Sequence, residues 1–103
     1  MIRVTFFGRE PEGFAVSGHS GLAESGSDIL CAAVTSAVRL TETLINDTLH
    51  AQAAVTVEEE TATITLRLQD RPDPEALHAL AALRNYLKQW ASEYPGHLSV
   101  RNR

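Results

Sequence analysis

The sequence predicts an α+β domain in which a single sheet carries two packed helices, with the element order β-β-α-β-β-α-β. Two stretches repeat their apolar residues at helical spacing, whereas the segments around them alternate apolar and polar residues as half-buried strands do. The strand-like segments come mostly in consecutive pairs separated by turn residues, a pattern typical of antiparallel hairpins. A chain of 103 residues fits one domain, so we expect residues 1–103 to form a single unit without a linker.

The N-terminal hairpin is predicted from two short alternating segments. Residues 2–8 place apolar side chains at every second position and are rich in β-branched and aromatic types, which favour strands. Residues 10–13 (Glu-Pro-Glu-Gly) have the composition of a turn. A second short strand follows and ends near Gly18.

The first helix is predicted to run from Asp28 to about Leu49. Its apolar residues recur at spacings of three and four, and Ser27 or Asp28 can serve as its N-cap. Its first half is rich in Ala and Val, which suits burial against a sheet. Residues 21–27 before it are small and polar, and we expect them to form a mobile loop.

The second half of the chain repeats this order of elements. Residues 53–57 and 61–68 alternate around the acidic turn 58–60 and predict another hairpin, with the turn most simply interpreted as a solvated loop. Asp73-Pro74-Glu75 is a helix start, with a cap residue, Pro at the first position and an acid in the first turn. Tyr94-Pro95-Gly96 ends that helix, and residues 97–100 are a candidate final strand.

Composition limits the classes of function. Hydrophobic residues make up 44% and charged residues 21%, as in ordinary globular proteins, and the net charge of −4 argues against a nucleic-acid surface. The single cysteine allows no intrachain disulfide and suits a reducing compartment. We find no signal peptide and no apolar run that approaches the roughly 20 residues of a membrane helix. We therefore expect a soluble cytoplasmic protein.

His19 and Cys31 are the residues with the clearest chemical potential. His19 follows the predicted second strand, and Cys31 is expected in the first turn of the first helix. A helix N-terminus stabilises a thiolate, an imidazole can take the thiol proton, and the amides of Leu30 and Cys31 could hold an oxyanion. Asp28 could orient His19 or act only as a helix cap. On spacing alone, Cys31 is more simply a small buried hydrophobe and His19 a turn residue.

The segment 18–38 (GHSGLAESGSDILCAAVTSAV) resembles the signature of the ribosomal-processing cysteine protease family, Prp. That signature has a Gly-His-small triplet, a glycine-containing loop, and a stretch that reads Gly-x-Asp, two aliphatic residues, Cys-Ala-Ala-Val. Ser20 departs from it, because Ala is more usual there, but both residues are small. The matching positions are Gly18, His19, Gly26, Asp28, Ile29, Cys31, Ala32, Ala33 and Val34.

The resemblance implies a cysteine endopeptidase that removes the N-terminal extension of the bacterial large-subunit ribosomal protein L-27. It implies a catalytic dyad of His19 and Cys31 and a homodimer. It also implies that the residues between the dyad order around the substrate. These loop residues are Gly21, Leu22, Ala23, Glu24, Ser25, Gly26 and Ser27. Separately, His50, His78 and His97 form no metal-site spacing with Cys31 or with one another, so we expect no metal or other cofactor.

Two other functions remain open at this point. The chain could be a non-catalytic ribosome-assembly or protein-binding module on the same fold, with Cys31 merely buried. It could also be a thiol redox sensor, although the chain offers no second cysteine to resolve a sulfenic acid. The pH dependence of alkylation of Cys31, the only thiol, separates the enzyme from the binding module.

Overall fold

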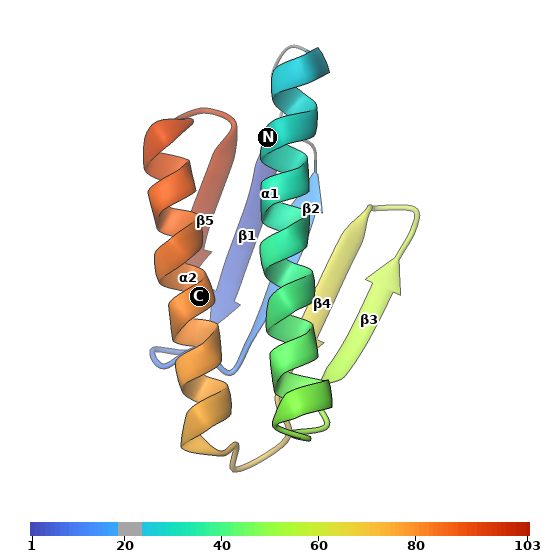
Figure 1. Ribbon diagram of the computed structural model, residues 1–103, viewed down its shortest axis with the longest axis vertical. Coiled ribbons are helices and arrows are strands. Elements are labelled where there is room, and N and C mark those ends of the chain that lie inside the picture. The colour runs from blue at the N-terminus through green and yellow to red at the C-terminus, as the bar shows by residue number, and fades with distance from the viewer. Residues whose placement is uncertain (19–23) are drawn as a thin grey trace.

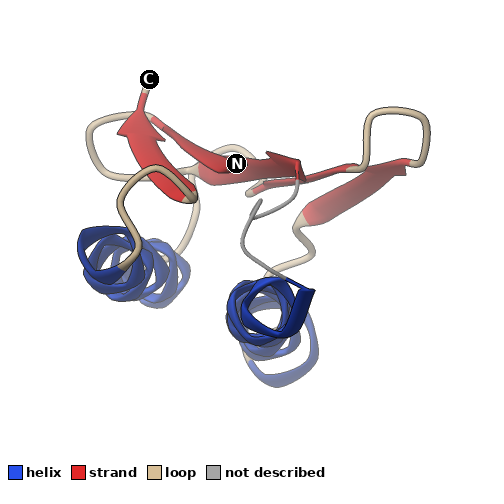
Figure 2. Cartoon of the chain, turned by 90° about the horizontal axis from the view of Figure 1, so that it is seen from above, coloured by secondary structure: helices blue, strands red, loops and turns tan. Residues whose placement is uncertain are grey.

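The computed structural model describes residues 1–18 and 24–103, and of residues 24–28 it describes the backbone alone. It contains a five-stranded sheet of order β3-β4-β2-β1-β5. Two helices lie side by side on one face of this sheet, and no helix of the described residues lies on the other face (Figures 1 and 2). The predicted α+β class and the order of strands and helices are confirmed. The elements are β1 (Ile2–Phe7), β2 (Gly13–Gly18), α1 (Glu24–Glu42), the short π-helix η1 (Thr43–Thr48), β3 (Ala54–Glu58), β4 (Thr63–Arg67), α2 (Pro74–Glu93) and β5 (Leu98–Asn102).

The sheet is mixed because its first strand has two different partners. β1 pairs with β2 in antiparallel fashion and with β5 in parallel fashion, while β4 pairs with both β2 and β3 in antiparallel fashion. The alternation predicted for β1 is confirmed, since Val4 and Phe6 are fully buried under the helices. The rings of Phe6 and Phe14, which are partners in the register, lie with centroids 5.9 Å apart at the centre of the core.

The first helix begins earlier than the sequence pattern predicted. α1 starts at Glu24, so Ser27 and Asp28 lie inside the helix and neither is its N-cap. Residues 24–27, which were expected in a loop, are part of this helix. Residues 21–23 of the expected loop lie outside the described part of the chain. Small polar residues carry little hydrophobic periodicity, which is why the pattern could not locate this boundary.

The helical segment Ile29–Thr48 is long and apolar enough to cross a membrane by length and composition, with a mean hydropathy of 1.2. The expectation that no apolar run approaches this length is therefore wrong. The side chains of Leu30, Val34, Val38 and Ile45 in this segment are buried against the sheet. Only 28% of the apolar window in this segment is buried, so the rest of the helix surface is open or partly open.

Candidate functional site

Cys31 lies on α1, immediately after a residue that anchors the helix to the sheet. Leu30 is fully buried, and Cys31 is partly buried and packs against the same core. The thiol is therefore fixed by a rigid helix and is not sealed in the interior. This arrangement is compatible with a nucleophile, which needs a fixed position together with access to a substrate.

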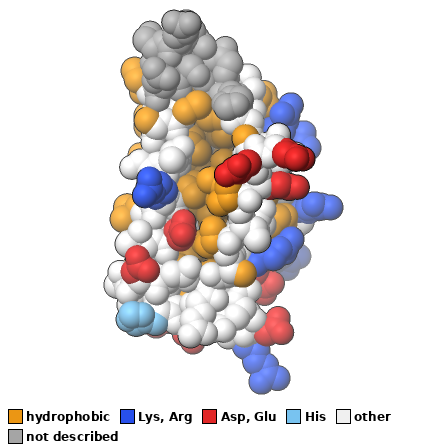
Figure 3. Space-filling view, turned by 90° about the vertical axis from the view of Figure 1, so that its right-hand side faces the viewer, with side chains coloured by type: hydrophobic (Ala, Val, Ile, Leu, Met, Phe, Trp, Pro, Cys, Tyr) orange, Lys and Arg blue, Asp and Glu red, His pale blue; other side chains and the backbone are white. Residues whose placement is uncertain are grey.

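The position of Cys31 around the helix places it on the flank of α1 that faces away from α2. Successive residues turn by about 100° around a helix, so Cys31 lies on one side of the buried Leu30 and Ala33 on the other. Ala33 lines a groove toward α2. The flank of Cys31 therefore faces the β3–β4 hairpin, where an apolar strip lies between α1 and the hairpin (Figure 3).

The predicted role of the helix start requires a correction. Because α1 begins at Glu24, Cys31 is its eighth residue and does not lie in the first turn. In a regular α-helix only the first four N–H groups lack a carbonyl partner. The amides of Leu30 and Cys31 are thus not free to hold an oxyanion in this arrangement, and the macrodipole acts on the thiol from two turns away.

β2 ends at Gly18, the residue that directly precedes His19 in the sequence. His19 itself lies outside the described residues, as does the side chain of Asp28, so the pairing of His19 with Cys31 and the orienting role of Asp28 stay predictions. The C-terminal end of β2 and the N-terminal turns of α1 lie at the same end of the molecule (Figure 1). The topology thus brings Gly18, the last described residue before His19, and the N-terminal turns of α1 to one end of the sheet.

Gly18, the last residue of β2, occupies a backbone conformation that suits only glycine. Its φ is +88°, and a Cβ at this position would collide with the carbonyl oxygen of Met1, the residue just before β1. Gly18 is also the partner of Ile2 in the β1–β2 register. The residue before His19 is therefore held tightly against β1, which fixes where the chain leaves the sheet.

Replacing Gly18 with Ala is expected to lower the free energy of unfolding by about 2–5 kcal/mol, because a left-handed backbone and a steric clash add together. Gly96 is a matched control, since its φ is also +88° but a Cβ there would meet nothing within 4 Å. Gly96→Ala should therefore lower the free energy of unfolding by only about 1–2 kcal/mol, which is the cost of the left-handed backbone conformation. Urea denaturation of both variants measures the difference, and equal losses would contradict the proposed clash with Met1.

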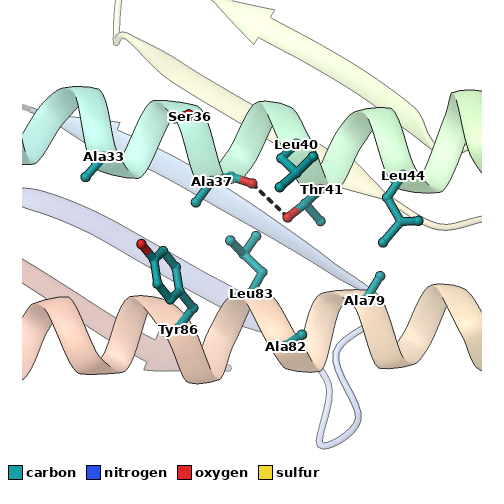
Figure 4. A pocket seen from close by; sticks show the side chains of 10 residues that line it. All are labelled: Ala33, Ser36, Ala37, Leu40, Thr41, Leu44, Ala79, Ala82, Leu83 and Tyr86. Atoms are coloured by element: carbon teal, nitrogen blue, oxygen red, sulfur yellow. Dashed lines mark hydrogen bonds between the residues drawn. The ribbon is translucent and has the colours of Figure 1, made fainter.

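A groove of about 500 Å³ lies between α1 and α2, and the polar side chains among its lining residues carry hydroxyl groups only. Its lining is mainly aliphatic, and the hydroxyl of Thr41 donates a 2.8 Å hydrogen bond to the carbonyl oxygen of Ala37 (Figure 4). Cys31 is not among its lining residues, which are Ala33, Ser36, Ala37, Leu40, Thr41, Leu44, Ala79, Ala82, Leu83 and Tyr86. This groove is therefore separate from the predicted nucleophile Cys31.

Metal chemistry has no visible support in the described part of the chain. Among residues 1–18 and 24–103, no group of three or more His, Cys, Asp or Glu residues could hold a metal ion. Sequence patterns indicate no functional role for the β3–β4 hairpin. Alternation shows which of its residues share a face, but only the strand order shows that β3 is an edge strand next to β4.

Comparison with known proteins gives a family match and several matching folds. The family model described as cysteine protease Prp matches residues 1–99. The fold is similar to that of an essential ribosomal processing protease Prp from S. aureus in complex with a covalently linked product peptide, with a TM-score of 0.88, 20% identity and coverage of 100% of both chains. It is also similar to SMU.848 from Streptococcus mutans, with a TM-score of 0.87, 21% identity and coverage of 99% of this chain and 93% of that chain. No curated protein matches.

Proposed function

Because the chain belongs to the cysteine protease Prp family, whose model spans residues 1–99, we propose that His19 and Cys31 form its catalytic dyad and that it trims a ribosomal protein precursor. The substrate we propose is large-subunit ribosomal protein L-27 carrying an N-terminal extension. The observation that carries the proposal is the placement of Cys31, the sole thiol. It is rigidly held, partly accessible and near the end of the sheet where β2 leads into His19.

The proposed reaction is acyl transfer through a thioester. His19 takes the proton of the Cys31 thiol, and the thiolate attacks the carbonyl carbon of the scissile peptide bond. The imidazolium of His19 then gives that proton to the departing amine as the C–N bond breaks. Water, deprotonated by His19, hydrolyses the thioester and restores the thiol.

Charge and compartment support a ribosomal substrate. The chain carries a net charge of −4, and ribosomal proteins are generally basic, so their encounter is favoured and weakens as salt is added. A single cysteine without a disulfide partner suits the reducing cytoplasm, where ribosomes are assembled. We therefore propose a cytoplasmic location.

The direct test is to incubate the purified protein with the extended L-27 precursor of the same genome and to determine the masses of the products. One cut that removes the extension supports the proposal. A precursor that stays intact, under conditions in which iodoacetamide shows Cys31 to be accessible, contradicts it.

We also propose that the protein is a homodimer, as the resemblance to the Prp family implies. Sedimentation equilibrium should then give about twice the chain mass of 11.2 kDa at micromolar concentration. A mass that stays at one chain across the accessible concentration range would contradict the dimer. This measurement is independent of the cleavage test.

A further inference from the structure

The outer side of α1 carries apolar side chains that the domain does not bury. Ile29 and Leu40 are 61% and 71% exposed. They are eleven positions apart, which is about three helical turns, so their side chains stand in one line along the helix. Ala33, one turn after Ile29, lines the groove toward α2, so this line runs along the edge of that groove. Contiguous apolar surface of this kind marks an interaction surface.

The groove between α1 and α2 continues the apolar surface onto the second helix. Leu40, Leu44 and Tyr86 all line it, and each belongs to the large hydrophobic side chains that are exposed in the described part of the chain. The small side chains of Ala37 and Ala82 line it as well (Figure 4). We call this surface the helix-pair patch and define it as Ile29, Ala33, Leu40, Leu44, Ala82 and Tyr86.

The shape of the helix-pair patch is complementary to itself. Leu40 forms a ridge beside the groove, whereas Ala37 and Ala82 keep the groove open because their side chains are small. In a twofold dimer every contact between two residues occurs twice, with the roles of the two copies exchanged. The ridge of each copy can therefore lie in the groove of the other, and a second copy of the chain fits both features at once.

Charge also favours a second copy as the occupant. None of the described residues that line the groove carries a charge. A twofold interface brings the same surface together from both sides, so a net charge on it would repel itself. The uncharged lining avoids this repulsion, and it offers no ion pair to the phosphates of a nucleic acid or to the charged groups of a peptide.

The helix pair is large enough to hold a dimer together. α1 has 19 residues and α2 has 20, so each helix is about 28–30 Å long, and the two together are about 20 Å wide. Their outer face thus covers about 560 Å² in each copy and about 1,100 Å² in a pair of copies, and a specific interface needs about 1,000 Å². The area is therefore sufficient without a contribution from the sheet.

We propose that the helix-pair patch is the interface of the homodimer, with the ridge of each copy in the groove of the other and the four helices between the two sheets. The inference rests on the proposed function, because the homodimer is part of that proposal, and it adds the surface through which the copies meet. Cys31 lies on the flank of α1 that faces away from α2, so this interface leaves both thiols accessible.

The test places a carboxylate in the patch and measures the mass of the protein by sedimentation equilibrium. Leu40→Glu on α1 and Ala82→Glu on α2 should each raise the dissociation constant of the dimer by at least about a hundredfold, because two unpaired carboxylates enter every interface. At micromolar concentration the mass of each variant should fall to the chain mass of 11.2 kDa, whereas the unaltered protein has about twice that mass. Both residues are exposed, so circular dichroism should show an unaltered fold.

Val57→Glu is the matched control, since Val57 is an aliphatic residue, 65% exposed, on the edge strand β3. It should leave the dissociation constant of the dimer unchanged. Unchanged dissociation constants in Leu40→Glu and Ala82→Glu, or an equal rise in Val57→Glu, would overturn the helix-pair patch as the interface.

The remaining outcomes separate this inference from the proposed cleavage. An unaltered protein that is a monomer at every concentration would overturn the interface together with the homodimer, while removal of the extension from the L-27 precursor would still support the protease. If the precursor stays intact but the mass follows the patch variants, the interface stands and the proposed cleavage is wrong.

Discussion

Replacing Cys31 with Ala is expected to abolish removal of the extension from the L-27 precursor, with a loss of at least about a thousandfold in rate. Removing the nucleophile leaves no atom to form the thioester, and losses of this size or larger follow removal of a nucleophile in comparable hydrolases. Cys31 is only partly buried, so a change to Ala should leave the fold intact. The rate of product formation, followed by mass spectrometry, measures the effect.

Ser36→Ala is the control for Cys31→Ala. Ser36 lies on the same helix but lines the groove toward α2, so its variant should process the precursor at the unaltered rate. Circular dichroism and thermal melting of both variants separate a loss of chemistry from a loss of structure. Full processing by the Cys31→Ala protein would remove Cys31 from the mechanism altogether.

Replacing His19 with Ala is expected to slow processing by about a hundred- to ten-thousandfold, since a positioned general base contributes about that much. The same change should slow alkylation of Cys31 by iodoacetamide near neutral pH, because alkylation also needs the thiolate. His78→Ala serves as the control, because His78 is exposed on α2 and has no assigned role. Both rates are measured on the same preparations.

The two readouts for His19 give different information. Slower processing with an unchanged rate of alkylation at every pH would contradict a role for His19 in activating the thiol. Loss of both rates, with a normal thermal melt, supports the proposed dyad. A substrate-binding residue that never touches the thiol would not change alkylation by a small reagent.

The strands and the second helix could be predicted from local pattern alone. Residues 2–7 form β1 as the alternation indicates, and α2 begins at Pro74 after the cap residue Asp73, as its start signal indicates. These features follow from rules that act within a few residues: side chains alternate in a strand, and Pro fits the first turn of a helix. They therefore remain visible without knowledge of the fold.

The start of α1 and the surroundings of Cys31 could not be predicted in this way. Residues 24–27 are small and polar, and this composition fits a loop as readily as an exposed helical turn. The exposure of Val57 depends on strand order. β3 is an edge strand, and β4, β2 and β1 lie between it and β5 at the opposite edge. Such order arises from contacts between distant parts of the chain, which periodicity does not record.

The partnership of the first and last strands also governs how the domain can assemble. β1 can pair with β2 as soon as the first hairpin forms. The other edge of β1 stays unpaired until β5, which follows α2 in the chain, binds to it. Contacts between such distant segments form slowly, and an open strand edge invites pairing with other molecules in the meantime. Conditions that delay docking of β5 should therefore favour aggregation of a half-built sheet over maturation of the enzyme.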